Sequence, residues 1–148
     1  MSEITPPVSV SLTVKDGNAA LDFYEKAFGA KILCRMTSPS GGLGHGEFKI
    51  GATRIYISDP CSDWHAKALP EEAMAPCVLS IPVENCDTAF KKAIAAGGKS
   101  LMEPEDRFWG IRTGMILDPF GYRWSLDQFL EEVSYEEMER RAKEIFGG

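Results

Sequence analysis

The chain has 148 residues, a length typical of one compact domain. Hydrophobic residues make up 44% and charged residues 26% of it, which is the composition of a globular chain with a core rather than of a disordered one. The net charge of -6 argues against a general affinity for nucleic acid or anionic lipid, because both need clustered Lys and Arg. We therefore expect neither nucleic acid nor a membrane as a partner.

The N-terminal segment has no basic stretch followed by a long apolar run, and no apolar run approaches the roughly 18 residues that cross a bilayer. We therefore expect a cytoplasmic protein. The cysteines have neither CxxC nor zinc-finger spacing, so we expect free thiols at Cys34, Cys61, Cys77 and Cys86. The only histidines are His45 and His65, which excludes a site that needs several imidazoles.

The first half of the chain predicts one helix among four strands. Residues 8–14 alternate apolar and hydroxylated side chains, which is typical of a strand with one buried face. Asp16 then caps a predicted helix over residues 17–28, and Gly29 ends it. Further strands are predicted over residues 31–36, 46–50 and 53–58. The first module therefore has the order βαβββ.

The second half repeats this order after a linker. Residues 59–76 contain Pro60, Pro70 and Pro76 and are typical of a connecting loop. The second module is predicted to have a helix over residues 86–96 and strands over residues 77–83, 100–103, 111–117 and 122–127. A final amphipathic segment, residues 134–146 with Ser134 as its cap, predicts a helix that docks on the body or on a partner subunit.

A single offset of 69 residues aligns the two modules, pairing Val14 with Val83 and Gly29 with Gly98. We expect one domain, residues 1–148. It consists of a first module at residues 7–58, a linker at 59–76, a second module at 77–128 and the C-terminal helix.

Two motifs within residues 7–128 resemble the vicinal-oxygen-chelate superfamily, which has the glyoxalase/bleomycin-resistance fold. The first motif runs from Val14-Lys15-Asp16 through Phe23-Tyr24 to Phe28-Gly29. The second comprises Phe108-Trp109-Gly110, Arg112, Gly114 and Asp118-Pro119-Phe120-Gly121-Tyr122-Arg123-Trp124, and is similar to the PhnB-like branch. The resemblance implies an α+β fold in which tandem βαβββ modules form an open, eight-stranded, cup-shaped sheet, with the C-terminal helix added.

The resemblance also implies where a metal would lie. Metal-dependent members hold a divalent ion with His or Glu from the first and last strand of each module. The matching positions here hold Ser9, Tyr56, Val78 and Ser125, and none of these is a competent ligand for zinc, nickel or iron. We therefore expect a cup without this metal centre, and no cofactor.

Alternation along the strands predicts which side chains line the cup. Along each strand the apolar side chains, including Trp124, are expected to face the helices. The residues that alternate with them are expected to face the cleft. Trp109 offers a surface for an aromatic ligand, with burial in the core as the alternative. Arg112 suits a carboxylate or phosphonate, with a structural ion pair as the alternative. The expected ligand-binding residues are Ser9, Ser11, Tyr56, Trp109, Arg112 and Ser125.

His45 and Glu47 lie two residues apart on a predicted strand, so both side chains project the same way. They are candidates for a catalytic acid/base pair or, with other groups, for metal ligands. In the alternative, Glu47 pairs with Arg112 or Arg54, and His45 forms a hydrogen bond with a neighbour.

Two functions remain open. One is metal-independent binding of a small anionic or aromatic molecule in the cup, which follows from the missing ligand residues. The alternative is a glyoxalase-type lyase or isomerase that uses His45 and Glu47 as acid, base or unorthodox metal ligands. The resemblance further implies a homodimer, and the 59–76 linker permits an exchange of modules between subunits.

Overall fold

The computed structural model describes residues 6–147. The expectation of no export signal rests partly on residues 1–5, which lie outside the described residues. The first module consists of β1 (Val10–Thr13), α1 (Gly17–Phe28), β2 (Lys31–Thr37), β3 (Leu43–Ile50) and β4 (Thr53–Ser58). A short 3-10 helix, η1 (Ser62–Trp64), lies in the linker. The second module consists of β5 (Val78–Pro82), α2 (Cys86–Ala95), β6 (Lys99–Asp106), β7 (Ile111–Leu117) and β8 (Arg123–Phe129). The C-terminal helix is α3 (Tyr135–Phe146).

Each module folds into its own mixed sheet of four strands. The strand order is β1-β4-β3-β2 in the first sheet and β5-β8-β7-β6 in the second. The first strand of each module pairs in parallel with the last, and the other pairs are antiparallel. Both sheets are open. The fold is therefore α+β with tandem βαβββ modules and a C-terminal helix, as the sequence predicted.

The helix caps follow the 69-residue offset. Asp16 accepts a hydrogen bond from the Ala19 N–H at 3.0 Å, which caps α1. Asn85, 69 residues later, accepts one from the Thr88 N–H at the same distance and caps α2. Both side chains satisfy a donor that the first helical turn leaves without a partner. The internal repeat in the sequence is therefore a structural repeat.

Two strands extend three residues beyond a predicted end. β3 begins at Leu43, whereas the sequence predicted a start at residue 46. The prediction missed these residues because Gly44 and Gly46 interrupt the side-chain alternation that marks a strand. β6 continues through Pro104 to Asp106, where the sequence predicted an end at residue 103. A proline is tolerated there because β6 lies at the edge of its sheet, where not every backbone N–H needs a strand partner.

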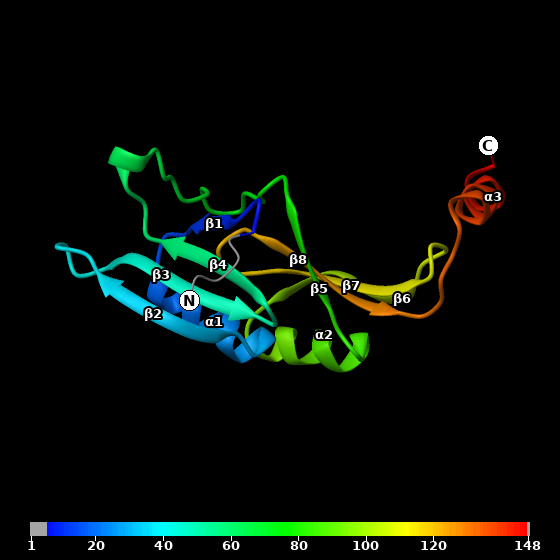
Figure 1. Ribbon diagram of the computed structural model, residues 1–148, viewed down its shortest axis with the longest axis horizontal. Helices are drawn as coiled ribbons and strands as arrows, with labels where there is room; N and C mark the ends of the chain where they lie inside the picture. The colour runs from blue at the N-terminus through cyan, green and yellow to red at the C-terminus, as the bar shows by residue number, and fades with distance from the viewer. Residues whose placement is uncertain (1–5, 148) are drawn as a thin grey trace.

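Aromatic side chains join the two modules. α1 and α2 lie side by side on one side of the molecule (Figure 1). The ring centroid of Tyr24 on α1 lies 5.2 Å from that of Phe48 on β3 and 5.2 Å from that of Trp124 on β8. Trp124 is buried, in agreement with the prediction that it belongs to the core. The modules therefore share one hydrophobic core, which lies between the helices and the sheets.

A buried carboxylate holds this aromatic contact together. Asp118, only 3% exposed, precedes the turn between β7 and β8. Its Oδ2 accepts hydrogen bonds from the Tyr24 hydroxyl at 2.6 Å and from Trp124 Nε1 at 2.9 Å. Its Oδ1 accepts from the backbone N–H groups of Phe120 and Tyr122. Burial, and then the nearby Asp118 charge, raise the pKa of Tyr24 well above its ordinary value, which keeps the phenol protonated as a donor.

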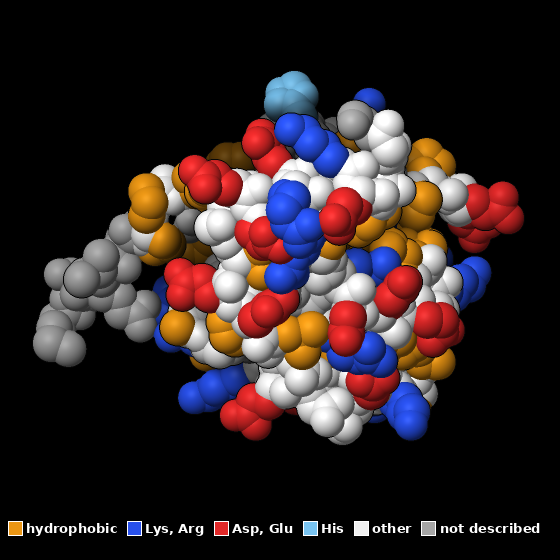
Figure 2. Space-filling view, turned by 90° about the vertical axis from the view of Figure 1, so that its right-hand side faces the viewer, with side chains coloured by type: hydrophobic (Ala, Val, Ile, Leu, Met, Phe, Trp, Pro, Cys, Tyr) orange, Lys and Arg blue, Asp and Glu red, His pale blue; other side chains and the backbone are white. Residues whose placement is uncertain are grey.

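α3 lies at the end of the second module, away from the first (Figure 1), and none of its described residues is buried. Arg141 anchors the helix by donating to the backbone carbonyl of Phe108 at 2.9 Å. Acidic and basic side chains are interspersed over this end of the molecule (Figure 2). In the described part of the chain, no helix combines the length and the apolar character needed to cross a membrane.

Replacement of Asp118 by Ala leaves the Tyr24 hydroxyl and the Trp124 indole N–H without an acceptor. We expect a loss of about 3–5 kcal/mol in the free energy of unfolding, because each buried donor left unsatisfied costs about 1–3 kcal/mol. Tyr24→Phe removes one of these donors together with its hydrogen bond, so it should cost only about 1 kcal/mol. Urea unfolding followed by circular dichroism measures both values. Equal losses in the two variants would show that the carboxylate does not organise the cluster.

Candidate functional site

One row of side chains crosses the face of the first sheet that is turned away from α1, which we call the open face. The strand register sets Cys34 opposite Glu47, Glu47 opposite Tyr56, and Tyr56 opposite Ser11. Cross-strand partners point to the same face of a sheet. Each strand therefore contributes one side chain to the row, and His45, two residues before Glu47 on β3, projects beside it.

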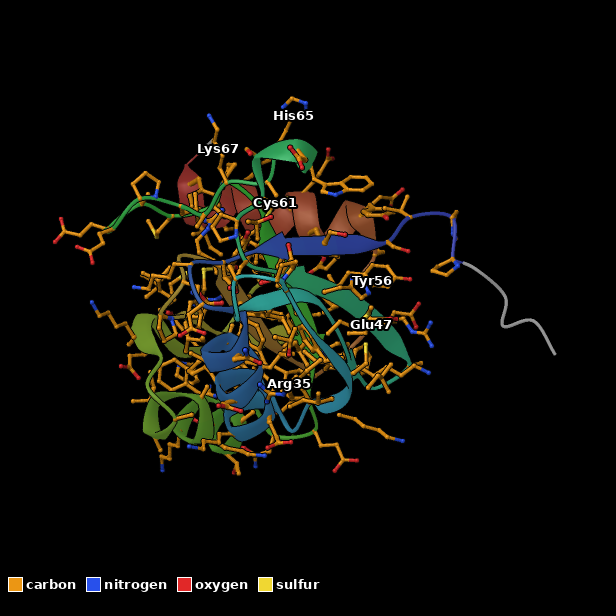
Figure 3. All side chains as sticks on the ribbon, turned by 90° about the vertical axis from the view of Figure 1, so that its left-hand side faces the viewer. Arg35, Glu47, Tyr56, Cys61, His65 and Lys67 are labelled. Carbon is orange, nitrogen blue, oxygen red and sulfur yellow. The ribbon has the colours of Figure 1, made fainter. Side chains whose placement is uncertain are left out.

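A cavity of about 1130 Å³ lies over this open face. Ser11, His45 and Tyr56 form part of its floor, and the linker segment after β4 forms its rim. Figure 3 shows Cys61 and His65 on that segment, with Tyr56 on the sheet beneath. The rim also carries Trp64, which is 83% exposed. The cavity therefore combines hydroxyl, imidazole and aromatic groups.

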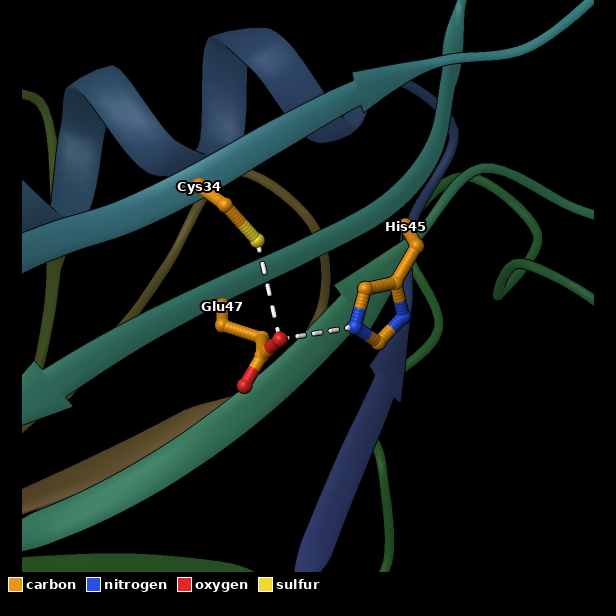
Figure 4. A group of neighbouring side chains, drawn as sticks. All are labelled: Cys34, His45 and Glu47. Atoms are coloured by element: carbon orange, nitrogen blue, oxygen red, sulfur yellow. Dashed lines mark hydrogen bonds and ion pairs between the residues drawn. The ribbon is translucent and has the colours of Figure 1, made fainter.

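Three side chains of different chemistry converge beside this cavity (Figure 4). His45 Nε2 lies 3.2 Å from Glu47 Oε2, and Cys34 Sγ lies 3.6 Å from the same oxygen. We call these residues the Cys34–His45–Glu47 cluster. Its three donor atoms all lie within 4.8 Å of one another. Arg54 Nε lies 3.6 Å from the other carboxylate oxygen, Oε1.

A β-bulge brings Cys34 into the cluster. Ile32 lies opposite Phe48, whose ring is in the core, but the next pair in the register is Cys34 with Glu47. Leu33 is thus an extra residue in β2. Strict alternation from Ile32 would turn Cys34 toward α1, and the bulge turns it to the open face. Sequence reasoning missed Cys34 for this reason, because nothing local marks the bulge.

The cluster fixes the charge of its carboxylate and thiol. The hydrogen bond from His45 lowers the pKa of Glu47 below its ordinary value, against the opposing effect of burial, with help from Cys34 and Arg54. Burial raises the pKa of the Cys34 thiol, and its hydrogen bond to Glu47 raises it further. At neutral pH the cluster therefore holds a carboxylate next to a protonated thiol.

Arg112 lies on the other face of its sheet from the one expected. Its guanidinium contacts Asp87 on α2 at 2.8 Å and Asp106 on β6 at 2.9 Å. Residues an even number of positions apart on a strand share a face, and Arg112 lies four residues from Ile116, which is buried in the core. Arg112 therefore faces α2. These contacts correspond to the structural ion pair that the sequence left open as the alternative.

Three further expected site residues lie away from this cavity. Ser125 is buried on the second sheet, with its Oγ 2.8 Å from the Oγ of Ser80. Trp109 precedes β7 and packs edge-on against Phe108, with ring centroids 4.9 Å apart. Ser9 precedes β1 and is exposed. The structure thus brings Ser11 and Tyr56 to His45 and Glu47, but not Ser9, Trp109, Arg112 or Ser125.

The cavity is lined by one module, although the sequence predicted contributions from both. Its described lining residues come from β1 to β4, the β2–β3 connection and the linker. The modules contact each other through their helices and the aromatic cluster instead. A second cavity, of about 260 Å³, lies between residues 69–73 and 117–121 and contains none of the candidate residues.

In this protein, the positions that hold the metal in metal-dependent relatives do not suit a metal ion. Tyr56 and Ser125 lie on different sheets, and Val78 offers no donor atom. Zinc and similar ions need imidazole, carboxylate or thiolate donors, which these positions lack.

Comparisons with known proteins agree with the fold. The chain matches the model of the Glyoxalase/Bleomycin resistance protein/Dioxygenase superfamily over residues 7–126. It is 33% identical over 139 residues to an uncharacterized protein of Mycobacterium bovis, which covers 92% of this chain and 91% of the relative. The chain therefore belongs to the glyoxalase/bleomycin resistance protein/dioxygenase superfamily.

Solved structures show the same fold at lower identity. TioX from Micromonospora sp. ML1 superposes with a TM-score of 0.68 at 21% identity, covering 85% of this chain and 100% of that chain. A glyoxalase/bleomycin resistance protein/dioxygenase from Nocardioides superposes with a TM-score of 0.66 at 20% identity, covering 90% of each chain.

The stabilising effect of Glu47 should depend on pH. Because its folded-state pKa is lowered, ionised Glu47 stabilises the fold above its unfolded pKa of about 4.3, and this contribution is lost as the pH falls through the folded value. We expect Glu47→Gln to lose up to about 1 kcal/mol at neutral pH. Urea unfolding at several pH values should show this difference shrinking as the pH falls below the unfolded pKa and through the folded one. A difference that does not change with pH would contradict the assignment.

Proposed function

We propose that this protein binds a small molecule in the cavity over the first sheet without an ion at the superfamily's metal positions. The observation that carries the proposal is the cavity itself, whose volume of about 1130 Å³ is ample for a drug-sized molecule. Its polar floor and aromatic rim are the combination that fixes the orientation of a bound ligand.

An aromatic ligand fits the lining better than a strongly anionic one. The rings of His45 and Tyr56 lie 5.7 Å apart with an interplanar angle of 32°, and the Trp64 indole lies on the rim. Flat rings stack on such surfaces. Arg112, the residue expected to recognise an anion, is bound to Asp87 and Asp106. We therefore favour a flat aromatic molecule, with anionic substituents as an addition.

A lyase or isomerase is the second candidate. The observation in its favour is the 3.2 Å contact between His45 Nε2 and Glu47 Oε2 beside the cavity, which is the spacing of an acid/base pair. Chemical analysis of a bound compound after incubation separates the two functions. Recovery of the compound unchanged supports binding, and a product whose formation requires His45 supports the enzyme.

We further propose that the chain belongs to the PhnB-like branch and is located in the cytoplasm. The motif around Trp109 and Asp118–Trp124 supports a place in the PhnB-like branch. The four free thiols, at Cys34, Cys61, Cys77 and Cys86, support a location in a reducing compartment such as the cytoplasm.

We also propose that the protein is a homodimer. α3 buries none of its described residues in its own chain, and Phe146 is 74% exposed at its end. Phe129, at the end of β8 in the same module, is 68% exposed. Apolar side chains gathered on an amphipathic helix with no buried face are typical of a subunit contact. A second copy is the occupant we propose for this surface.

Binding of a flat aromatic probe should depend on Tyr56 and Trp64. Anilinonaphthalene sulfonate serves as the probe, because its fluorescence reports binding directly. We expect Tyr56→Ala and Trp64→Ala each to weaken its affinity by about 3- to 10-fold, the size of one stacking contact. Trp109→Ala is the matched control, because this exposed indole lies outside the cavity. An equal loss in the control, or none at Tyr56, would remove the proposed site.

Light scattering of the full chain should give a mass twice that of one 16.3 kDa chain. We expect Phe146→Asp to shift the population toward monomer, because it places a charge in the proposed contact. A single-chain mass for the unaltered protein would rule out the homodimer.

A further inference from the structure

We propose that Cys34, His45 and Glu47 form a binding site for a zinc-like divalent cation on the open face of the first sheet. This site lies on β2 and β3, whereas the superfamily's metal positions map to the first and last strands of the modules. The inference is independent of the binding proposal, because the cavity can accept a ligand with or without an ion at its edge.

The separations of His45 and Cys34 from the Glu47 oxygen match those of ligands around one ion, and all three donor atoms lie within 4.8 Å of one another. Zinc bonds to sulfur at about 2.3 Å and to nitrogen or oxygen at about 2.0–2.2 Å. In a tetrahedron these bond lengths separate nitrogen from oxygen by about 3.3 Å and sulfur from oxygen by about 3.5 Å. The corresponding separations here are 3.2 Å for His45 Nε2 to Glu47 Oε2 and 3.6 Å for Cys34 Sγ to Glu47 Oε2. Both separations from the Glu47 oxygen are therefore close to those around a tetrahedral ion.

The chemistry of the donors selects the kind of ion. Thiolate, imidazole and carboxylate are the three groups that hold zinc in proteins. A soft thiolate among them disfavours magnesium and calcium, which take oxygen ligands. The cluster therefore fits zinc, or cobalt as its spectroscopic substitute.

The surroundings orient the carboxylate for this role. Arg54 Nε lies 3.6 Å from Glu47 Oε1, so the other oxygen, Oε2, is the one directed at Cys34 and His45. Contacts of this kind beside a metal site hold a ligand in its binding orientation. The bulge at Leu33 supplies the thiol from the neighbouring strand, and bulges that redirect a side chain are frequent next to functional sites.

The second module shows that the cluster is not a by-product of the fold. Its β6 has a register shift between Ser100 and Met102, where β2 has its bulge. Met102 then lies opposite Met115, and Met115 lies opposite Ser125. The structural equivalents of Cys34 and Glu47 are thus two thioethers. At these positions only the first module has a thiol and a carboxylate that can bind zinc.

The proposed site leaves one coordination position open. The His45 side chain is 43% exposed and lines the cavity, so an ion held by the cluster would face it. Three protein ligands and an open fourth position are the arrangement of catalytic rather than structural zinc. Water or an oxygen atom of a cavity ligand is the expected fourth partner.

Binding of the ion requires one proton to leave. At neutral pH a glutamate side chain is ionised and a cysteine thiol carries its proton, so Cys34 is the ligand that must lose one. The metal–sulfur bond forms as the S–H bond breaks, and the proton goes to solvent. Binding through His45 Nε2 replaces the hydrogen bond to Glu47, and the ring proton moves from Nε2 to Nδ1, so the imidazole neither gains nor loses a proton.

The test is calorimetric titration of the full-length, metal-free protein with Zn²⁺, followed by absorption spectra with Co²⁺. We expect one ion per chain, release of one proton, and a thiolate-to-cobalt charge-transfer band in the near ultraviolet. Cys34→Ser should abolish the band and weaken Zn²⁺ binding by at least about tenfold. Glu47→Gln should weaken Zn²⁺ binding and keep the band. Circular dichroism of each variant establishes that it folds.

Cys61→Ser and His65→Gln are the matched controls, because they remove a thiol and an imidazole from the rim of the same cavity. Both should bind Zn²⁺ like the unaltered protein and keep the cobalt band. The inference is overturned if the chain binds no stoichiometric ion, or if Cys34→Ser binds normally while a control loses the ion. Neither result bears on the probe titration that tests the cavity.

Discussion

The buried carboxylate of Asp118 is the constraint on which the arrangement of the two modules depends. It ties the hydroxyl of Tyr24 on α1 to the indole of Trp124 on β8, and so connects the helix of one module to the last strand of the other. A buried polar group is tolerated where hydrogen bonds satisfy it, and here Oδ1 accepts from two backbone N–H groups in addition. Because the modules meet through their helices and this cluster, the open faces of both sheets remain free of the shared core.

The open face of the first sheet becomes a site because strand register aligns polar residues across it. The parallel pairing of β1 with β4 and the antiparallel pairing of β4, β3 and β2 place one polar side chain from each strand in a row. The linker rises over this row and encloses the cavity. The equivalent row in the second sheet holds Met102, Met115, Ser125 and Ser80. Two modules with one fold therefore have different surfaces, and only the first combines a cavity with metal-ligand chemistry among the described residues.

This difference bears on how the superfamily's fold supports function. A fold does not fix chemistry, which depends on the side chains placed on it. Here the positions of the superfamily's metal carry hydroxyl and apolar groups, while a thiol, an imidazole and a carboxylate meet on the two neighbouring strands, β2 and β3. The candidate site thus lies beside the usual one, at the edge of the same open face.

The sequence by itself determined the repeat, the order of elements and the ends of α1 and α3, because caps and periodicity are local signals. It also placed His45 and Glu47 on one face, since two residues on a strand always share a face. Only the tertiary structure decided that Cys34 joins them and that Arg112 faces α2. The position of Cys34 depends on the bulge in β2. The position of Arg112 depends on which set of alternate residues of β7 packs against α2. Both are set by pairing and packing with distant segments, and no pattern within a single strand records them.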